Sequence, residues 1–270
     1  MADKNHVYTN GHHESVLQSH KWRTVENSAQ FLVKYLKPDS FLLDAGCGPG
    51  NISAGVSELL PNGKVIGMDF STAIIEQAKS EFTPSKYKNL EFQQGDIYHL
   101  DLADNTFDII YTHQVIQHLM NPVDALKELR RVLKPGGIIA VREADNHAFT
   151  WYPQLPELDR WRNLYREVTQ HNGAESNGGR FLKAWVMQAG LQVSDVSCTT
   201  WVFSNDRDRN WWGGLWSKRI LESDFAKQAL AYDLSNVAEL EELSEAFLRW
   251  AKDPSGIWTI PNMEVIATKN

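Results

Sequence analysis

The segment Leu42-Leu43-Asp44-Ala45-Gly46-Cys47-Gly48-Pro49-Gly50 carries the strongest structural signal of this chain. Two apolar residues lead into an acid, after which glycine occupies every second position. This order predicts a buried strand, a tight turn and the beginning of a helix, because glycine lets the backbone turn sharply and lets a ligand approach bare peptide. The amide groups at the beginning of that helix would favour an anionic or electron-rich group, and Asp44 would favour a positively charged one.

Strand and helix patterns alternate regularly through the next hundred residues. Apolar runs that end in acids or turns are separated by amphipathic segments, and a further amphipathic helix is expected before them at 22–36. Strands separated by helices pair in parallel through right-handed crossovers, and the ligand of such a sheet lies outside the carboxyl ends of its strands. We therefore expect an α/β fold with strands at 41–44, 64–69, 90–93, 107–111 and 138–141.

Two motifs point to a known family. Asp44-x-Gly46-x-Gly48-x-Gly50 resembles the first motif of the class I S-adenosylmethionine-dependent methyltransferases, and Leu133-Lys134-Pro135-Gly136-Gly137 is similar to a later one. The likeness covers roughly residues 38 to 145 and is most similar to the ubiquinone- and menaquinone-pathway C-methyltransferases and their small-molecule relatives. It implies a Rossmann-like, doubly wound sheet of seven mostly parallel strands with an antiparallel last strand. It also implies S-adenosylmethionine as the cofactor, released as S-adenosylhomocysteine.

The resemblance gives each acid at a strand end a role toward this cofactor. Asp69 would accept hydrogen bonds from the ribose hydroxyls, since a carboxylate can accept two side by side. Asp96 would face the adenine amino group, and Asp44 would orient the amino-acid end. The cofactor-binding residues expected on this basis are Asp44, Gly46, Cys47, Gly48, Gly50, Asp69, Phe70, Gly95, Asp96, Ile97 and His113.

Three histidines are candidates for a general base. Methyl transfer from a sulfonium is an in-line displacement, so a base is needed only if the acceptor must lose a proton. His113 is the first candidate because it follows the fourth strand, where the reacting methyl should point. His118 on the next turn is the second, and His20, together with Arg23 of the N-terminal segment, is the third. Each could equally be a histidine that only packs or forms a hydrogen bond.

The second half of the chain has a different character. Nine of the ten tryptophans follow residue 146, helices are expected at 154–171 and 178–189, and strands at 191–203 and 257–268. The predicted organisation is an N-terminal cap segment at 1–30, with a mobile tail over the first 20 residues, a methyltransferase domain at 31–205 and 253–270, and a helical insertion at 206–252 that serves as a substrate lid. The aromatic residues either bind a hydrophobic or planar substrate or form the insertion's own core.

Other enzyme classes fit less well. A dinucleotide-binding dehydrogenase would show G-x-G-x-x-G/A, but Asn51 or Ser53 stands at the last position. Residues 112–115 lack the Asn/Asp-Pro-Pro-aromatic motif of many enzymes that methylate amino groups of DNA and glutamine, and they lack the acid of metal-dependent catechol-type enzymes. We therefore expect C- or O-methylation of a small, hydrophobic or planar molecule. A non-catalytic regulatory partner that binds S-adenosylmethionine and, less favoured, a dehydrogenase remain as alternatives.

The composition of the chain argues against several classes of partner. The net charge is −7 and Lys and Arg form no long run, which argues against nucleic acid as a partner. His12 and His13 lack further ligands at fixed spacing, so no metal site is expected. No apolar run is long enough to span a bilayer, and the first residues do not resemble a targeting segment. Two cysteines are too few for a disulfide framework and fit a reducing compartment, so we expect the protein in the cytoplasm, or in the cytoplasm and nucleus. We expect it to be a monomer or a homodimer.

Overall fold

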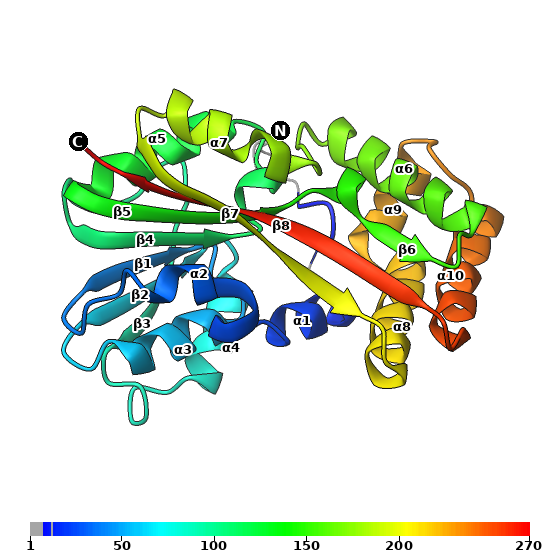
Figure 1. Cartoon of the computed structure of the whole chain (residues 1–270), viewed down its shortest axis with the longest axis horizontal. Helices are drawn as coiled ribbons and strands as arrows, with labels where there is room; N and C mark the ends of the chain where they lie inside the picture. Colours follow the sequence, from blue (N-terminus) through cyan, green and yellow to red (C-terminus); the bar gives the residue numbers. More distant parts are fainter. Residues whose placement is uncertain (1–7, 12) are drawn as a thin grey trace.

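The structure is a computed structural model that describes residues 8–11 and 13–270. One mixed sheet runs through it in the order β3-β2-β1-β4-β5-β8-β6, and β7 pairs with the second edge of β8 (Figure 1). The first five strands in space are parallel, and β8 is antiparallel to all of its neighbours. The strands are β1 (Phe41–Ala45), β2 (Lys64–Asp69), β3 (Leu90–Gln94), β4 (Phe107–His113), β5 (Leu133–Ala144), β6 (Thr150–Tyr152), β7 (Gln192–Phe203) and β8 (Ile257–Thr268).

This architecture confirms the predicted Rossmann-like, mostly parallel sheet with an antiparallel last strand. The short strand β6, which was not predicted, adds to the expected seven. Two strands, β4 and β5, differ from their expected bounds by more than one residue. β4 continues two residues further, so that His113 ends the strand instead of following it, and β5 begins at Leu133, which pairs with Phe107 ahead of a bulge.

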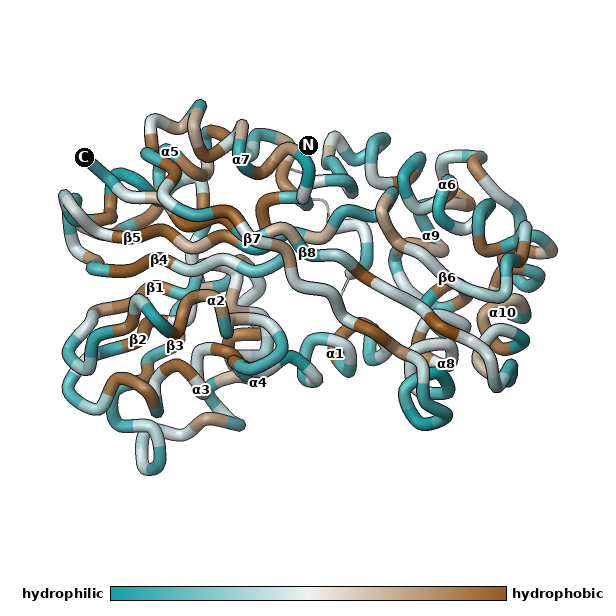
Figure 2. The backbone as a smooth tube through the Cα atoms, in the orientation of Figure 1, coloured by the Kyte–Doolittle hydropathy of each residue, from teal (hydrophilic) through white to brown (hydrophobic). Residues whose placement is uncertain are grey.

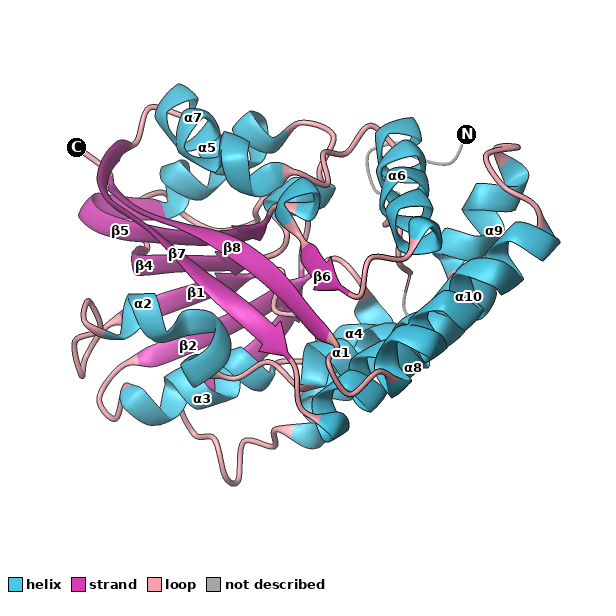
Figure 3. Ribbon diagram, turned by 45° about the vertical axis from the view of Figure 1, so that its right-hand side comes forward, coloured by secondary structure: helices cyan, strands magenta, loops and turns pink. Residues whose placement is uncertain are grey.

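Helices cover both faces of the sheet and bury its apolar side chains in two separate cores (Figure 3). Hydropathy follows this arrangement, because hydrophobic residues run along much of β4 and β5 (Figure 2). No helix in the described part of the chain has the length and apolarity needed to cross a bilayer. On one face lie η2 (Val25–Ala29), α2 (Gln30–Val33), α3 (Asn51–Leu59) and α4 (Thr72–Glu81), and on the other α5 (Pro122–Val132) and α7 (Gly178–Gln188).

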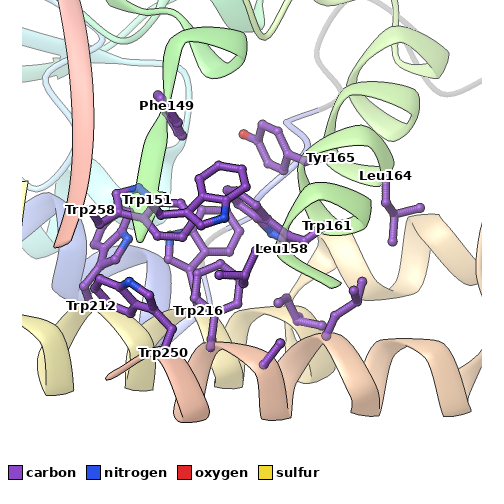
Figure 4. Close-up of a cluster of buried hydrophobic side chains, with 14 of the residues drawn as sticks. Phe149, Trp151, Leu158, Trp161, Leu164, Tyr165, Trp212, Trp216, Trp250 and Trp258 are labelled. Atoms are coloured by element: carbon purple, nitrogen blue, oxygen red, sulfur yellow. The ribbon is translucent and has the colours of Figure 1, made fainter. Parts of the chain in front are cut away.

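Strands β7 and β8 extend beyond the parallel strands to a helical unit at one end of the sheet (Figure 1). The unit consists of α6 (Pro156–His171), α8 (Asp206–Glu222), α9 (Asp224–Ala231) and α10 (Val237–Lys252). Its core is aromatic, as Figure 4 shows around Trp161. Most of the tryptophans are therefore core residues of this unit, which favours the second interpretation of their clustering. The buried ones are Trp151, Trp161, Trp201, Trp212, Trp216, Trp250 and Trp258.

The N-terminal segment is more ordered than the sequence suggests. A mobile tail is expected over residues 1–20, but Glu14–Lys21 form the helix α1. The His13 side chain accepts a hydrogen bond from the backbone N–H of Ser15 at its first turn, and Val16 is fully buried. Arg219 of α8 donates to the carbonyl of Ser15, which fixes α1 against the helical unit. His12 and residues 1–7 lie outside the described residues.

Candidate functional site

A cavity of about 520 Å³ lies at the carboxyl ends of β1, β2 and β4. Its position is the one expected for the ligand of an open parallel sheet. All three candidate histidines and all predicted cofactor residues except Gly50 line it. The predicted residues on its walls are His20, Asp44, Gly46, Cys47, Gly48, Asp69, Phe70, Gly95, Asp96, Ile97, His113 and His118.

The glycine turn presents bare backbone to this cavity. Gly46 has φ +80° and Gly48 has φ +53°, conformations that L-residues with side chains rarely adopt. A Cβ atom at Gly46 would lie 2.3 Å from Cγ2 of Val115. The backbone N–H groups of Gly46 and Cys47 both donate to the carbonyl of Met68, at 2.7 and 2.9 Å, so the turn is fixed to β2.

The structure places Gly50 differently from the other predicted cofactor residues. It has φ +88° but does not line the cavity. A Cβ atom there would lie 2.6 Å from Cζ of Phe92 and 3.3 Å from Cβ of Ala78. The third glycine therefore lets the beginning of α3 pack against β3 and α4, and it holds the cavity wall without facing the ligand.

Asp69, the last residue of β2, is fixed by two backbone donors. One carboxylate oxygen accepts from the N–H of Gly48 and the other from the N–H of Ser71, each at 3.0 Å. An ionised carboxylate has about four lone-pair sites, so each oxygen can accept one more hydrogen bond. The residue is thus oriented and still able to bind a diol.

Asp44 is a buried acid at the end of β1. Its side chain is 3% exposed, and Oδ2 accepts from the Ser53 hydroxyl at 2.5 Å. Burial raises the pKa of Asp44 to about 7; the Ser53 hydrogen bond lowers it and the negative charge of Asp69 raises it further. A cationic ligand group beside this carboxyl would restore its ionised form.

The third strand end carries Asp96, whose Oδ1 accepts from the N–H of Tyr98 at 2.9 Å. The adjacent Ile97 is buried, whereas the Phe70 ring is 51% exposed. Both side chains line the cavity, so this end combines one acid with apolar walls. Such a combination suits a planar ring with a polar edge.

His113 is held by its neighbours as a hydrogen-bond donor. Its Nδ1 lies 3.4 Å from Nη1 of Arg142, and because arginine can only donate, Nδ1 is the acceptor and Nε2 carries the proton. Nε2 is buried without a partner among the described residues. Burial, with a smaller contribution from Arg23 and Arg142, holds the pKa of His113 well below its usual value.

The other two candidate histidines, His118 and His20, lie in different surroundings. Burial, aided by the charge of Arg23, lowers the pKa of His118 to about 3. His20, on α1, has Nε2 3.4 Å from the Tyr8 hydroxyl, and its Nδ1 lies 3.9 Å from where a Cβ atom at Gly48 would stand. Of the three, His20 is therefore the one placed over the glycine turn.

Comparison with known proteins identifies the family of this chain. Residues 36–197 match the family model described as a methyltransferase domain. The chain belongs to that family. An uncharacterized methyltransferase of Schizosaccharomyces pombe is 34% identical over 97% of this chain and 96% of its own length. A demethylmenaquinone methyltransferase of Lactococcus lactis is 36% identical over 43% of this chain and 47% of its own.

Solved structures agree on the fold. A phosphoethanolamine N-methyltransferase 2 of Haemonchus contortus, solved with phosphomonomethylethanolamine and S-adenosylhomocysteine, superimposes with a TM-score of 0.54 at 17% identity. It covers 89% of this chain and 52% of its own. The chain is thus a class I S-adenosylmethionine-dependent methyltransferase, as its motifs indicate, and the dehydrogenase alternative is wrong.

The cofactor of the family fits the residues present. The glycine turn leaves room for a ligand against the backbone, and Asp69 keeps acceptor capacity for ribose hydroxyls. The raised pKa of Asp44 is expected of a buried carboxyl whose cationic ligand group is not bound. When bound, S-adenosylmethionine supplies the activated methyl group. Among the described residues, no three His, Cys, Asp or Glu side chains converge in a way that could hold a metal ion.

The cover of the methyltransferase site comes from the N-terminus. Tyr8, Leu17, His20 and Arg23 line the cavity, whereas no described residue of 206–252 does. The predicted lid therefore contributes no lining residue to this cavity, and its helix α8 contacts α1 through Arg219. Sequence patterns gave no signal for Tyr8 or Leu17, because their role depends on a packing of α1 that local periodicity does not encode.

Gln114 is a further residue whose role could not be predicted from the sequence. Its φ of +52° places a non-glycine residue in the left-handed region, a strain that often marks functional sites. Its Oε1 accepts from Nη2 of Arg23 at 2.7 Å, and its Nε2 donates to Oδ1 of Asn262 at 2.9 Å. Gln114 thereby positions the Arg23 guanidinium at the edge of the cavity.

Proposed function

We propose that this methyltransferase moves the methyl group of S-adenosylmethionine to a carbon or oxygen of a small, hydrophobic or planar molecule. One observation carries the proposal. The cavity combines acids and a bare glycine turn with the polar side chains of Arg23, Gln114 and His118. The acids and the turn suit the cofactor, which leaves Arg23, Gln114 and His118 for an acceptor of limited size.

Within this proposal, three acids hold the cofactor. Asp69 accepts hydrogen bonds from the ribose, Asp96 faces the adenine amino group with Ile97 and Phe70 against the ring, and Asp44 lies near the positively charged amino-acid end. Oriented binding brings the acceptor atom into line with the methyl–sulfur bond, and exclusion of water protects the sulfonium.

The histidines take different roles. A base works best when its pKa lies near the working pH, and the lowered pKa values of His113 and His118 weaken both in that role. His113 instead offers its Nε2–H as a donor toward the acceptor. His20 is the base where the acceptor must lose a proton, since it covers the glycine turn beside the cavity.

The helical insertion, the assembly and the location are part of the same proposal. Residues 206–252 would act as a lid indirectly, by holding α1 in place. Two unpaired cysteines, Cys47 and Cys198, fit the reducing cytoplasm or nucleus. A small-molecule acceptor needs no nucleic-acid surface, and we take the protein to act as a monomer or homodimer.

The test uses purified full-length protein. We expect calorimetric titration to give S-adenosylmethionine binding that Asp69→Ala weakens at least about tenfold, whereas the exposed control Asp101→Ala leaves it unchanged. Unaltered binding to the Asp69→Ala protein would contradict the ribose assignment. Labelled methyl transfer to planar phenols or 1,3-diketones supports the acceptor class, and transfer only to protein or nucleic acid would overturn it.

A further inference from the structure

A second, smaller cavity of about 70 Å³ lies directly against the first. We call it the inner chamber. It shares Tyr8, His20, Arg23, Gln114 and His118 with the main cavity, so the two are neighbours across these side chains. Its remaining walls include Trp212, Trp216 and Arg219 of α8, which brings the helical insertion into the site at this point.

The walls of the inner chamber carry an unusual number of buried polar atoms without a hydrogen-bond partner among the described residues. Four are N–H donors: Nε of Arg23 and Arg219, and the indole Nε1 of Trp212 and Trp216. Two are amide oxygens, of Asn10 and Gln117, and the remaining two, Nδ1 of His118 and Oγ of Ser176, can donate or accept. Native proteins leave few such groups unsatisfied, because each costs about 1–3 kcal/mol. Among these residues the unpartnered N–H donors outnumber the unpartnered amide oxygens, which favours a ligand that accepts hydrogen bonds.

The positive charge of two arginines on the chamber walls also favours an anionic ligand. Within the described part of the chain, neither Arg23 nor Arg219 forms an ion pair with a carboxylate. Arg219 is only 5% exposed; its Nη2 donates to the carbonyl of Ser15 and the hydroxyl of Ser19, and its guanidinium lies 4.5 Å from the centre of the Trp216 ring. Burial lowers the pKa of both arginines to about 10, so both stay charged at neutral pH.

Both arginines are also held in place. Gln114, in its strained backbone conformation, holds Nη2 of Arg23, and α1 holds Nη2 of Arg219. In each case the Nε–H remains for another partner. Two fixed, unneutralised guanidinium groups and two indole N–H groups form a preorganised site for a compact oxyanion, since arginine binds carboxylates in a planar fork.

We propose that the inner chamber binds a carboxylate of the methyl acceptor, with Arg23 and Arg219 neutralising its charge and Trp212 and Trp216 donating to its oxygens. The inference rests on the proposed function and specifies its substrate class as planar carboxylic acids. A chamber of this volume has room for a carboxylate, and the adjoining main cavity takes the rest of the molecule. Ordered water is the alternative occupant, and it would show no preference for an anion.

The test compares benzoate with its neutral isostere benzamide as probes of the protein loaded with S-adenosylhomocysteine. We expect benzoate to raise the thermal midpoint while benzamide does not. Arg219→Met and Arg23→Met should each weaken benzoate binding about ten- to a hundredfold, the loss of one charge-assisted hydrogen bond. Arg219→Lys keeps the charge and should retain part of the preference. Trp216→Phe keeps an aromatic ring but removes the indole N–H, and it should weaken binding less than loss of either arginine.

Arg207→Met is the matched control, because Arg207 is an exposed arginine on the same helix and should leave benzoate binding unchanged. Equal stabilisation by benzoate and benzamide, no stabilisation by benzoate, or an intact preference in the Arg23→Met/Arg219→Met double variant would each overturn the proposal. Binding of S-adenosylhomocysteine to every variant is measured first. If the wild-type protein does not bind S-adenosylhomocysteine, the proposed function is contradicted. If it binds S-adenosylhomocysteine but shows no benzoate effect, only the carboxylate site is contradicted.

Discussion

Replacing Asp44 by asparagine should stabilise the cofactor-free methyltransferase and weaken its cofactor binding. The Asp44 carboxyl is 3% exposed, and burial raises its pKa to about 7 from an ordinary 3.8. Between these two values the folded protein keeps a proton that the unfolded chain releases. The free energy of unfolding therefore falls as the pH rises through this window. The amide side chain of the Asp44→Asn variant would carry no charge and would still accept from the Ser53 hydroxyl.

The size of the effect follows from the two pKa values. Between pH 5 and pH 8 the folded form should lose about 2.7 kcal/mol of stability relative to the Asp44→Asn variant, at 1.36 kcal/mol for each pKa unit. Urea unfolding of both proteins without cofactor, at several pH values in this range, measures it. A difference between the two proteins that does not change with pH would refute a raised pKa at this residue.

Cofactor binding should show the opposite trend. A cationic group beside Asp44 favours the ionised carboxyl, whose population in the free protein rises from about one tenth at pH 6 to about nine tenths at pH 8. The affinity for S-adenosylmethionine should therefore rise about tenfold over this range, and binding should release a proton. Calorimetry in two buffers of different ionisation enthalpy measures both, and Asp44→Asn controls for titration of the cofactor itself. The same pH slope in both proteins would contradict the reasoning.

Three further predictions concern neighbouring parts of the molecule. Glu264→Ala leaves the fully buried Arg142 without its 3.1 Å partner and should cost about 3–5 kcal/mol in urea unfolding; a loss below about 1 kcal/mol would contradict this. Gly50→Ala forces a Cβ atom against Phe92 at positive φ and should cost at least about 1–2 kcal/mol, with weaker cofactor binding, and an unchanged thermal midpoint argues against it. His113 should remain neutral at and above its ordinary pKa of 6.5, so NMR of its imidazole should show no titration near that pH, and a midpoint near 6.5 would refute the donor assignment.

That Asp44, Asp69 and Asp96 line the cavity could be predicted because they are close in sequence to the strands that place them. Asp69 ends β2, Asp44 lies one residue before the end of β1 and Asp96 lies two residues after β3, and parallel strands present such ends at one edge of the sheet. The different environments of Gly46 and Gly50 could not be predicted in this way. Gly46 faces the cavity and Gly50 faces Phe92, which is a matter of tertiary packing that the spacing of glycines does not contain.

The acceptor half depends on contacts between distant segments. Arg219 meets Ser15 and Ser19 across about 200 residues, and Gln114 meets Arg23 across 91. No local pattern reports such pairs. The tryptophans illustrate the same limit, since their composition indicated an aromatic surface or an aromatic core but not which one. The close packing around Trp161 favours the core, and the tryptophans that line the inner chamber are Trp22, Trp201, Trp212 and Trp216.

The charges of the site are separated along the proposed path of the methyl group. Asp44 and Asp69 line only the main cavity, the proposed cofactor end, whereas Arg219 lines only the inner chamber and Arg23 lines both. A cationic sulfonium and an anionic acceptor would each be drawn to its own end, so the field of the site orients both before they react. Transfer removes the sulfonium charge. The carboxyl of Asp44 then faces fewer positive charges, and its hold on S-adenosylhomocysteine should weaken as its pKa rises again, which favours release of that product after the methyl has moved.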